Sequence, residues 1–576
     1  MIKTRNPTES FFLFAFGIML TTGSFLVKYQ FVSQIIHYVK YQERTGVISL
    51  FMLIYAVLFF ITGAFSVYFS SKGVSLKVLF VERFKEVIGF IRNFFLHLYN
   101  YGFSPTEKIW ITGAIITGLI IRAYYVAAPM RADESATFYY FVQGPLYKSF
   151  IYLEPNNHVL HTLFARFMVD VFGNNQFALR FPAFITGVLC IPLIFIANQR
   201  LNGRKSGYVS MMLMAIFPVI LIFDTMARGY SLVNFFMLTG VIIGNSMINE
   251  NTFSRTLMFA LNSALGIFVM PTFLFPAFGL YLWVGILLLK QESDILRILR
   301  SFVIPSLIML VLFTFLLYTP VMLVTNNFDK LFSNSTIKPL QWKVFLHLTP
   351  NHLRHSLTFL FSDIKISLKI LSGVIFISGV IWLSVKRKFK LLLLMGSFMI
   401  GAVILYLAKR SIPFPRTWIY LFPVMFMVAD AGVSFLFFTQ KKRFRQIFQG
   451  MVFTFMIATG IFLINTDTVT NSHYTETFHE AKPVAAFLSA TIKNGDTLQM
   501  DHPVGFPVRY YLIQNKVVLN NSSDSNYLPK RYFVIKKKQN ELIDQAHQNP
   551  VKIFELGEAE IYMAARDTSI KNLRLE

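Results

Sequence analysis

The segment ITGAIITGLIIRAYYVAAPMRADESATFYYF, residues 111–141, decides how the chain folds. The apolar run over 109–128 is long enough for a helix across a bilayer, which needs about 20 residues. Directly beyond it come two adjacent carboxylates, Asp133 and Glu134. This pair indicates a polar site at the membrane surface, but it also suits a solvated helix start, where acids favour the helix dipole.

The composition agrees with a membrane protein rather than a soluble globule. Of 576 residues, 55% are hydrophobic and only 14% are charged, whereas soluble domains carry about 25% charged residues. Aromatic residues make up 16%, which excludes a disordered chain. The single cysteine, Cys190, excludes a disulfide framework and a cysteine-based metal site.

The charge is distributed as in a multi-span membrane protein. A net charge of +25 would suggest nucleic-acid binding in a soluble protein. Here the basic residues form short clusters between apolar segments, the positive-inside pattern of cytoplasmic loops. We therefore expect no nucleic-acid partner. The clusters are Arg200/Arg204/Lys205, Lys386/Arg387/Lys388/Lys390 and Lys441/Lys442/Arg443/Arg445.

The apolar segments predict an all-α polytopic protein with about thirteen transmembrane helices and a cytoplasmic N-terminus. A further apolar segment, residues 158–173, is short and carries Arg166 and Asp170. If it crossed, the basic clusters would face outward, so we interpret it as an interfacial or re-entrant helix whose Arg166–Asp170 spacing suits a surface ion pair. The predicted spans lie near 11–27, 47–70, 109–128, 181–198, 208–223, 231–249, 256–271, 273–289, 301–323, 364–385, 391–408, 418–438 and 447–465.

This assignment of membrane spans divides the chain into three regions. Residues 1–105 hold two extra spans and an amphipathic cytoplasmic connector, and residues 106–465 hold the main transmembrane domain. Residues 466–576 change character: a helix-like run over 475–492 is followed by strand-like runs near 516–520, 531–536 and 551–556. We expect a small α/β domain outside the cytoplasm.

The threading places residues 129–180, 224–230, 324–363 and 409–417 on the outer side, where carboxylates and guanidinium groups could form one site. The forked donors of arginine suit the phosphate of a lipid-linked sugar, and a carboxylate can take the proton of an acceptor hydroxyl. The candidate carboxylates are Asp133, Glu134 and Glu154, and the candidate cations are Arg228 and Arg416, with Lys409 and Arg410 as weaker candidates.

Several polar residues have two readings. His158 and His161 could bind a metal or anchor an interfacial helix, and Arg180 could bind substrate or anchor at the membrane interface. Asp224 could cap a turn or pair with Arg228. Asp430 lies inside a predicted span, where an acid usually faces the protein interior and has a partner.

The order of these residues resembles a known family. Asp133-Glu134 after an in-to-out span, the Glu154-Pro155-Asn156-Asn157-His158 segment, Arg180, Arg228-Gly229-Tyr230 and Pro415-Arg416 are similar to the GT-C class of polyprenyl-phosphate-sugar glycosyltransferases. Within that class the chain is most similar to the bacterial protein-mannosyltransferase-like and aminoarabinose-transferase-like group. The resemblance covers roughly residues 105–440.

The resemblance implies a site at the outer leaflet of a plasma (inner) membrane and an inverting sugar transfer. It makes Asp133 the general base, with Glu134 shaping the same loop. Glu154 falls where related proteins have a glutamate before a Lys-Pro pair, which Pro155-Asn156 replaces here, so donor-phosphate binding is assigned to Arg228 and Arg416. The implied substrate pocket comprises Asn157, His158, Arg180 and Tyr230, and a divalent metal, if one is used, would involve Asp133, Glu154 and His158.

The function expected is a glycosyltransferase that uses a polyprenyl-phosphate sugar and a lipid, glycan or protein acceptor. Two alternatives remain open at this point. A transporter or flippase of lipid-linked saccharides would place polar groups at mid-membrane, and a ligase would release a pyrophosphate carrier.

Overall fold

The computed structural model describes residues 85–86, 88–89, 92, 102–152, 156–292, 294–325, 339–438, 442–472, 477–493, 496–500, 504–517, 530–537 and 550–565. The predicted spans near 11–27 and 47–70 lie outside the described residues, as does Glu154.

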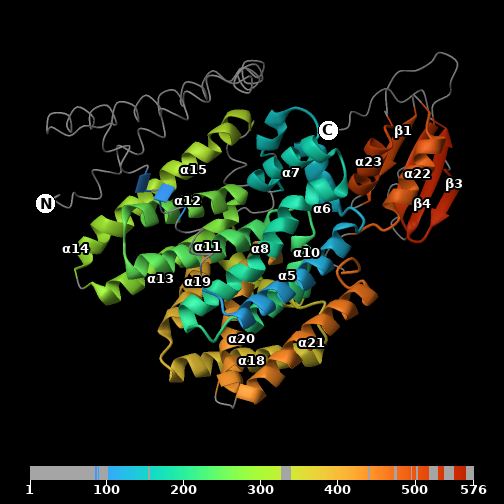
Figure 1. Ribbon diagram of the computed structural model, residues 1–576. Helices are drawn as coiled ribbons and strands as arrows, with labels where there is room; N and C mark the ends of the chain where they lie inside the picture. Colours follow the sequence, from blue (N-terminus) through green and yellow to red (C-terminus); the bar gives the residue numbers. More distant parts are fainter. Residues whose placement is uncertain are drawn as a thin grey trace, which may run out of the picture.

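The body of the protein is a bundle of helices (Figure 1). In the described part, eight helical segments are long and apolar enough to cross a membrane, and α12 is a shorter apolar helix. All eight coincide with predicted spans. The bundle helices are α5 (Pro105–Val126), α8 (Gln176–Asn202), α9 (Tyr208–Ile216), α10 (Pro218–Asp224), α11 (Tyr230–Asn249), α12 (Phe253–Val269), α13 (Leu274–Gln291), α14 (Ile295–Ile298), α15 (Ile304–Val324), α18 (Ile366–Val385), α19 (Phe389–Lys409), α20 (Leu421–Phe438) and α21 (Lys442–Thr466).

The predicted span 208–223 is broken into two helices, α9 and α10. Phe217 between them is extended, with φ −70° and ψ 125°. The following Pro218 explains the break, since proline disfavours the α conformation in the residue before it and has no N–H of its own. The start of α9 is capped from across the bundle by Asp430 of α20, which accepts hydrogen bonds from the N–H groups of Gly207 (2.8 Å) and Val209 (2.7 Å). Asp430 therefore has the interior partner expected of an acid inside a span.

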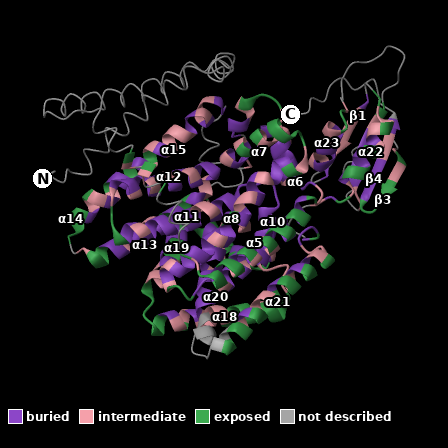
Figure 2. Cartoon of the chain, in the orientation of Figure 1, coloured by how far each residue is buried: buried purple, intermediate pink, exposed green. Residues whose placement is uncertain are grey.

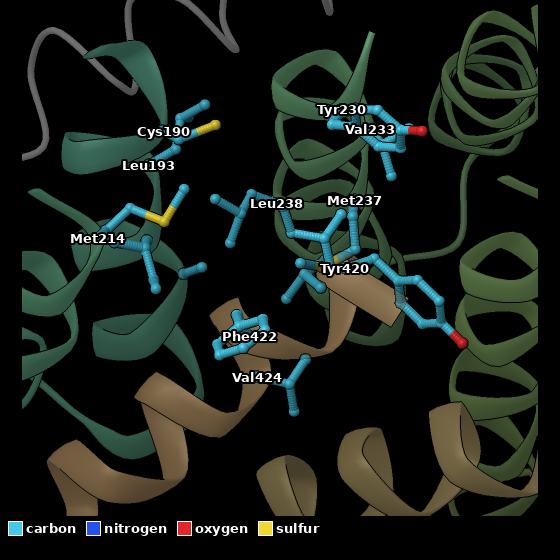
Figure 3. Packing of buried hydrophobic residues seen from close by; sticks show 14 of the residues in the cluster. Cys190, Leu193, Met214, Tyr230, Val233, Met237, Leu238, Tyr420, Phe422 and Val424 are labelled. Carbon is cyan, nitrogen blue, oxygen red and sulfur yellow. The ribbon is translucent and has the colours of Figure 1, made fainter. Parts of the chain in front are cut away.

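The centre of the bundle is a continuous apolar core. Figure 3 shows side chains of α8 (Cys190, Leu193), α9 (Met214), α11 (Val233, Met237, Leu238) and α20 (Phe422, Val424) meeting there. Helices at the periphery, such as α18 and α21, carry many exposed apolar residues instead (Figure 2). Exposed apolar side chains on a helical bundle are what a lipid environment requires.

The alternation of the helices puts the basic clusters and the candidate site at opposite ends. The C-terminal ends of α5 and α10 and the N-terminal ends of α8 and α11 meet near Asp133, as the hydrogen bonds below show. Arg200 and Arg204 lie at the other end of α8, and residues 386–390 lie at the start of α19, whose far end leads to Arg416. The basic residues at 200–204 and 386–390 therefore lie at the opposite end of the bundle from the candidate site.

Two further helices lie at the site end. Helix α7 (Val159–Phe172) corresponds to the helix predicted over 158–173. Its Arg166 Nε and Asp170 Oδ2 are 3.6 Å apart, which confirms the expected ion pair. It buries Val159, His161, Thr162 and Ala165 and exposes an apolar face of Phe164, Phe167, Val171 and Phe172. Helix α17 (Trp342–Leu360) lies against the short 3-10 helix η5 (Pro415–Tyr420).

The C-terminal region is a small α/β unit at the same end of the bundle (Figure 1). Its sheet has the strand order β1-β2-β4-β3, with β1 (Thr497–Met500) parallel to β2 (Lys530–Lys536) and the other pairs antiparallel. Strands β2 and β3 (Val551–Leu556) confirm two predicted strands, whereas β1, β4 (Ala559–Ala565) and α23 (Gly505–Gln514) were not predicted individually. Helix α22 (Ala481–Thr491) packs against α23. Their core is shared with Met130, Phe138 and Leu179 of the site end.

Candidate active site at one end of the bundle

The candidate site begins in the short helix α6 (Ala132–Thr137), directly beyond α5. Asp133 and Glu134 both lie in its first turn, but their environments differ. Glu134 is fully buried, whereas the Asp133 side chain is 28% exposed. Adjacent positions on a helix point in different directions, so one carboxylate faces the interior and the other faces the surface.

Glu134 is held by a dense set of donors. Its Oε2 accepts from the Nε of Arg180 (3.0 Å) and the N–H of Ala227 (2.8 Å), and its Oε1 accepts from the N–H of Arg131 (2.8 Å) and from Arg180 Nη2. Burial alone would raise the pKa of Glu134, but the Arg180 guanidinium and these bonds hold it below its ordinary value. Glu134 is therefore an ionised anchor of the loop rather than an accessible base.

Arg180 completes this anchor from the first turns of α8. Its two terminal nitrogens donate to the carbonyls of Val126 (2.8 Å), Ala128 (2.6 Å) and Pro129 (2.9 Å), at the end of α5. With no exposed surface, Arg180 fixes the chain that leads from α5 into α6. Arg180 was expected to be either a membrane-interface anchor or a substrate ligand. The bonds above support neither role, because they direct its guanidinium group to Glu134 and to the end of α5.

Asp133 lies between two arginines. Its Oδ2 is 3.2 Å from Nη1 of Arg416 and 3.8 Å from Nη2 of Arg228. The three residues come from α6, from the turn between α10 and α11, and from η5, so the fold brings together segments that are far apart in sequence. This is the convergence that the sequence predicted.

The two guanidinium groups are supported differently. Arg228 is buried and its Nη1 donates to the Thr137 hydroxyl (3.2 Å), the Asn156 carbonyl (2.8 Å) and the Asn156 side-chain oxygen. Its Nε has no hydrogen-bond partner within the described part of the chain. Arg416 is 26% exposed and lies over the ring of Phe414, 4.7 Å from its centroid. Arg228 is therefore buried and held by several acceptors, whereas Arg416 is partly open to solvent.

The remaining pocket residues form a layer beneath Arg228. The N–H of Gly229 donates to Nδ1 of His158 (2.7 Å), and the ring of Tyr230 meets the His158 ring edge-on at 5.1 Å. Burial, followed by the positive charge of Arg228, lowers the pKa of His158 well below its ordinary value, so the ring is neutral. Because Nδ1 accepts a hydrogen bond, the ring proton is on Nε2.

Asn157 has a structural role. Its amide nitrogen donates to the carbonyls of Ser149 (2.9 Å) and Ile151 (2.8 Å), and its oxygen accepts from the Thr162 hydroxyl (2.8 Å).

His161 is also buried, and neither ring nitrogen has a hydrogen-bond partner among the described residues. Burial and the charge of Arg228 lower the pKa of His161 to about 3.

The two weaker cation candidates, Lys409 and Arg410, lie at the C-terminal end of α19. Lys409 is exposed at the end of α19, and Arg410 lies over the ring of Trp342 at 5.6 Å. The expected capping or Arg228 pairing of Asp224 is wrong: Asp224 forms a buried pair with Arg122, whose Nη2 is 2.6 Å from Oδ2. Arg122 lies in α5 and faces the end of α10. The sequence does not indicate this pairing.

Sequence reasoning missed Asn156 and Thr137 as partners of Arg228. Asn156 is one of the two residues, Pro155-Asn156, that replace the Lys-Pro pair of the family. This departure from the family pattern was the one feature of the sequence that pointed to Asn156. Within the described ranges, no group of three or more His, Cys, Asp or Glu side chains could hold a metal ion; Glu154 lies outside those ranges.

With this geometry, the chain has the fold of the GT-C glycosyltransferases, as the resemblance predicted. ArnT from Cupriavidus metallidurans in the apo state is similar, with a TM-score of 0.53 and 11% sequence identity over 80% of this chain and 98% of that chain. The structure of that protein bound to undecaprenyl phosphate gives a TM-score of 0.50, with the same identity and coverage. No protein-family model matches the chain. No curated protein matches it either.

Proposed function

We propose that the protein is an integral-membrane inverting glycosyltransferase, which moves one sugar from a polyprenyl-phosphate donor to an acceptor hydroxyl at the outer face of the membrane. The observation that carries this proposal is the placement of the Asp133 carboxylate between Arg416 and Arg228, at 3.2 Å and 3.8 Å. A carboxylate beside two guanidinium groups unites a proton acceptor and a phosphate-binding site within one small region.

The two arginines have separate tasks in this proposal. Arg228 is buried and fixed by Thr137 and Asn156, so it provides a preorganised charge for the donor phosphate. Arg416 is partly exposed and contacts Asp133 directly. When a phosphate binds, it competes for the guanidinium groups, and the Asp133 carboxylate becomes available to accept a proton.

The transfer is a single displacement at C1 of the sugar. The acceptor hydroxyl attacks C1 of the sugar from the side opposite the phosphate, and its proton passes to Asp133. The C1–O bond to the phosphate breaks, and the bonding electrons remain on the departing polyprenyl phosphate. Arg228 and Arg416 stabilise the additional negative charge that develops on this leaving group. Attack opposite the leaving group inverts the configuration at C1.

Two observations support the outer face and the lipid donor. The basic clusters lie at the opposite end of the bundle from Asp133. By the positive-inside rule the end with the basic clusters is cytoplasmic, so Asp133 is on the outer side. The Cupriavidus ArnT, which shares the fold, is known bound to undecaprenyl phosphate. Arg416 lies in η5, which packs against α17, a helix with exposed apolar side chains such as Leu346 and Leu357; this position suits a lipid phosphate at the membrane edge.

The transporter alternative has less support. The charged groups that the structure places inside the bundle have structural partners: Asp430 caps α9, and Asp224 pairs with Arg122. A transport pathway instead uses polar groups that meet the cargo near the membrane centre.

The product distinguishes the proposal from a ligase. Purified protein in liposomes is incubated with a set of polyprenyl-phosphate sugars and polyprenyl-pyrophosphate sugars, together with glycolipid, glycan and peptide acceptors. Release of polyprenyl monophosphate together with glycosylated acceptor is expected. Release of pyrophosphate carrier would identify a ligase, and movement of intact donor between leaflets without release would identify a flippase.

A further inference from the structure

The C-terminal α/β region contacts the chain that carries Asp133 through one side chain in particular, Tyr511 of α23. The phenol oxygen of Tyr511 accepts a hydrogen bond from the N–H of Met130 (3.2 Å) and another from the side-chain amide of Gln176. Met130 is the third residue before Asp133, and Gln176 begins α8. Tyr511 is 4% exposed, so these bonds lie away from bulk water.

These two bonds close a ring of contacts around the base of the site. Gln176 and Arg180 are four residues apart on α8 and therefore lie on one face. Arg180 binds Glu134, and Glu134 accepts from the N–H of Arg131, the residue after Met130. From Met130 the ring returns to Tyr511. Each member constrains the next, and Asp133 lies on the segment that the ring encloses.

Packing reinforces the same junction. The Phe138 ring, one residue beyond α6, meets the Tyr510 ring edge-on at 5.0 Å, and the Tyr140 ring meets Phe506 at 5.5 Å. Backbone pairing between Arg131 and Thr477 adds a further tie on the other side of Met130. The C-terminal region thus holds both ends of α6.

We infer that Tyr511 is a positioning residue for Asp133, through which the C-terminal region sets the direction of the Asp133 carboxylate. This inference rests on the proposed role of Asp133 in transfer. Tyr511 does not touch the reacting atoms: it acts through Met130 on one side and through Gln176, Arg180 and Glu134 on the other. A docked C-terminal region is therefore part of the working site rather than a separate appendage.

The neighbouring Tyr510 provides a matched control. Its hydroxyl accepts a hydrogen bond from the Gln514 side chain (2.8 Å) within the same helix. Tyr510→Phe therefore removes one hydrogen bond of the same region and leaves the ring of contacts through Tyr511 closed. Tyr511→Phe removes the hydroxyl that joins Met130 to Gln176. Both variants keep their aromatic rings and the apolar core, so both are expected to fold.

The test compares kinetics of the two variants in the transfer assay. Tyr511→Phe should lower kcat by about 10-fold or more, because small displacements of a reacting group can cost up to about 100-fold. The KM for the donor should stay within a factor of about 2, since the groups that bind phosphate are untouched. Tyr510→Phe should match the wild type. Gln176→Met should lower kcat as well, and the double variant with Tyr511→Phe should be no worse than the single ones, because both open the same ring.

A second readout does not depend on activity. Amide hydrogen exchange of residues 130–137 should be faster in Tyr511→Phe and unchanged in Tyr510→Phe. Equal exchange in both variants, or equal kcat values, would overturn the positioning role. If the wild type has no transferase activity but the exchange differs as stated, the proposed function fails and the structural coupling stands.

Discussion

Asp133 and Arg416 form an ion pair, with 3.2 Å between Oδ2 and Nη1, that joins the first helix beyond α5 to the turn before α20. Removing the carboxylate charge should abolish proton acceptance and leave the fold intact. We expect Asp133→Asn to lower kcat by about 100-fold to 10,000-fold, the usual contribution of a general base. The assay is release of polyprenyl phosphate from the matched donor.

Asp170→Asn is the control for this change, because Asp170 is an exposed carboxylate in the ion pair with Arg166 on the same end of the protein. It should retain wild-type kcat. Full activity of Asp133→Asn would remove Asp133 from the mechanism.

Arg416→Ala should weaken donor binding. A charge-assisted hydrogen bond to phosphate contributes about 1.5–3 kcal/mol, so the donor KM should rise by about 10-fold or more, with a smaller effect on the acceptor KM. Arg410→Ala serves as the comparison, because Arg410 lies over Trp342. An equal rise in both variants would show that loss of general positive charge, rather than phosphate contact at Arg416, is responsible.

Glu134→Gln should destabilise the protein and do so in a pH-dependent way. Breaking a buried ion pair by neutralising one partner costs about 3–5 kcal/mol. The folded pKa of Glu134 lies below its ordinary value of 4.5, so the stabilisation is complete above pH 4.5 and is lost as the pH falls through the folded pKa. The difference in thermal unfolding between wild type and variant should therefore shrink on acidification. A difference that stays constant with pH would contradict an ionised Glu134.

His161→Phe should make stability less dependent on pH. Folding lowers the pKa of His161 from 6.5 to about 3, so the unfolded chain takes up a proton below pH 6.5 that the folded protein does not. This linkage removes up to about 1.4 kcal/mol of stability per pH unit as the pH falls, and the phenylalanine variant lacks it. His355→Phe, at an exposed position of α17, should retain the wild-type slope. Parallel curves for wild type and His161→Phe would contradict the prediction.

The sequence predicted the positions of the long helices well because length and hydrophobicity alone define a membrane span. It also predicted that Asp133, Arg228 and Arg416 would converge, since all three fall at helix ends on one side of the threading. Only the family resemblance assigned different roles to Asp133 and Glu134; the residue pattern alone did not distinguish the two carboxylates. That distinction depends on Arg180 and on the N–H of Ala227, which reach Glu134 only in the folded bundle.

Pairings between helices were beyond the sequence for the same reason. Arg122 lies inside an apolar run, and nothing local indicates that its partner is Asp224. The link from Tyr511 to Met130 joins positions 381 residues apart, and nothing near Tyr511 in the sequence indicates that its hydroxyl binds Met130. The break between α9 and α10 was not predicted either, because residues 208–223 were assigned to one span, although Pro218 explains the break through proline geometry.

The cap that Asp430 gives to α9 also bears on biosynthesis. Gly207 and its neighbours leave the ribosome long before Asp430, which lies 223 residues downstream. Until α20 enters the membrane, the first amide groups of α9 need another partner, such as interfacial water or an insertion factor. The start of α9 cannot reach its final hydrogen bonding until α20 has been synthesised, and a chain truncated before α20 lacks this cap altogether.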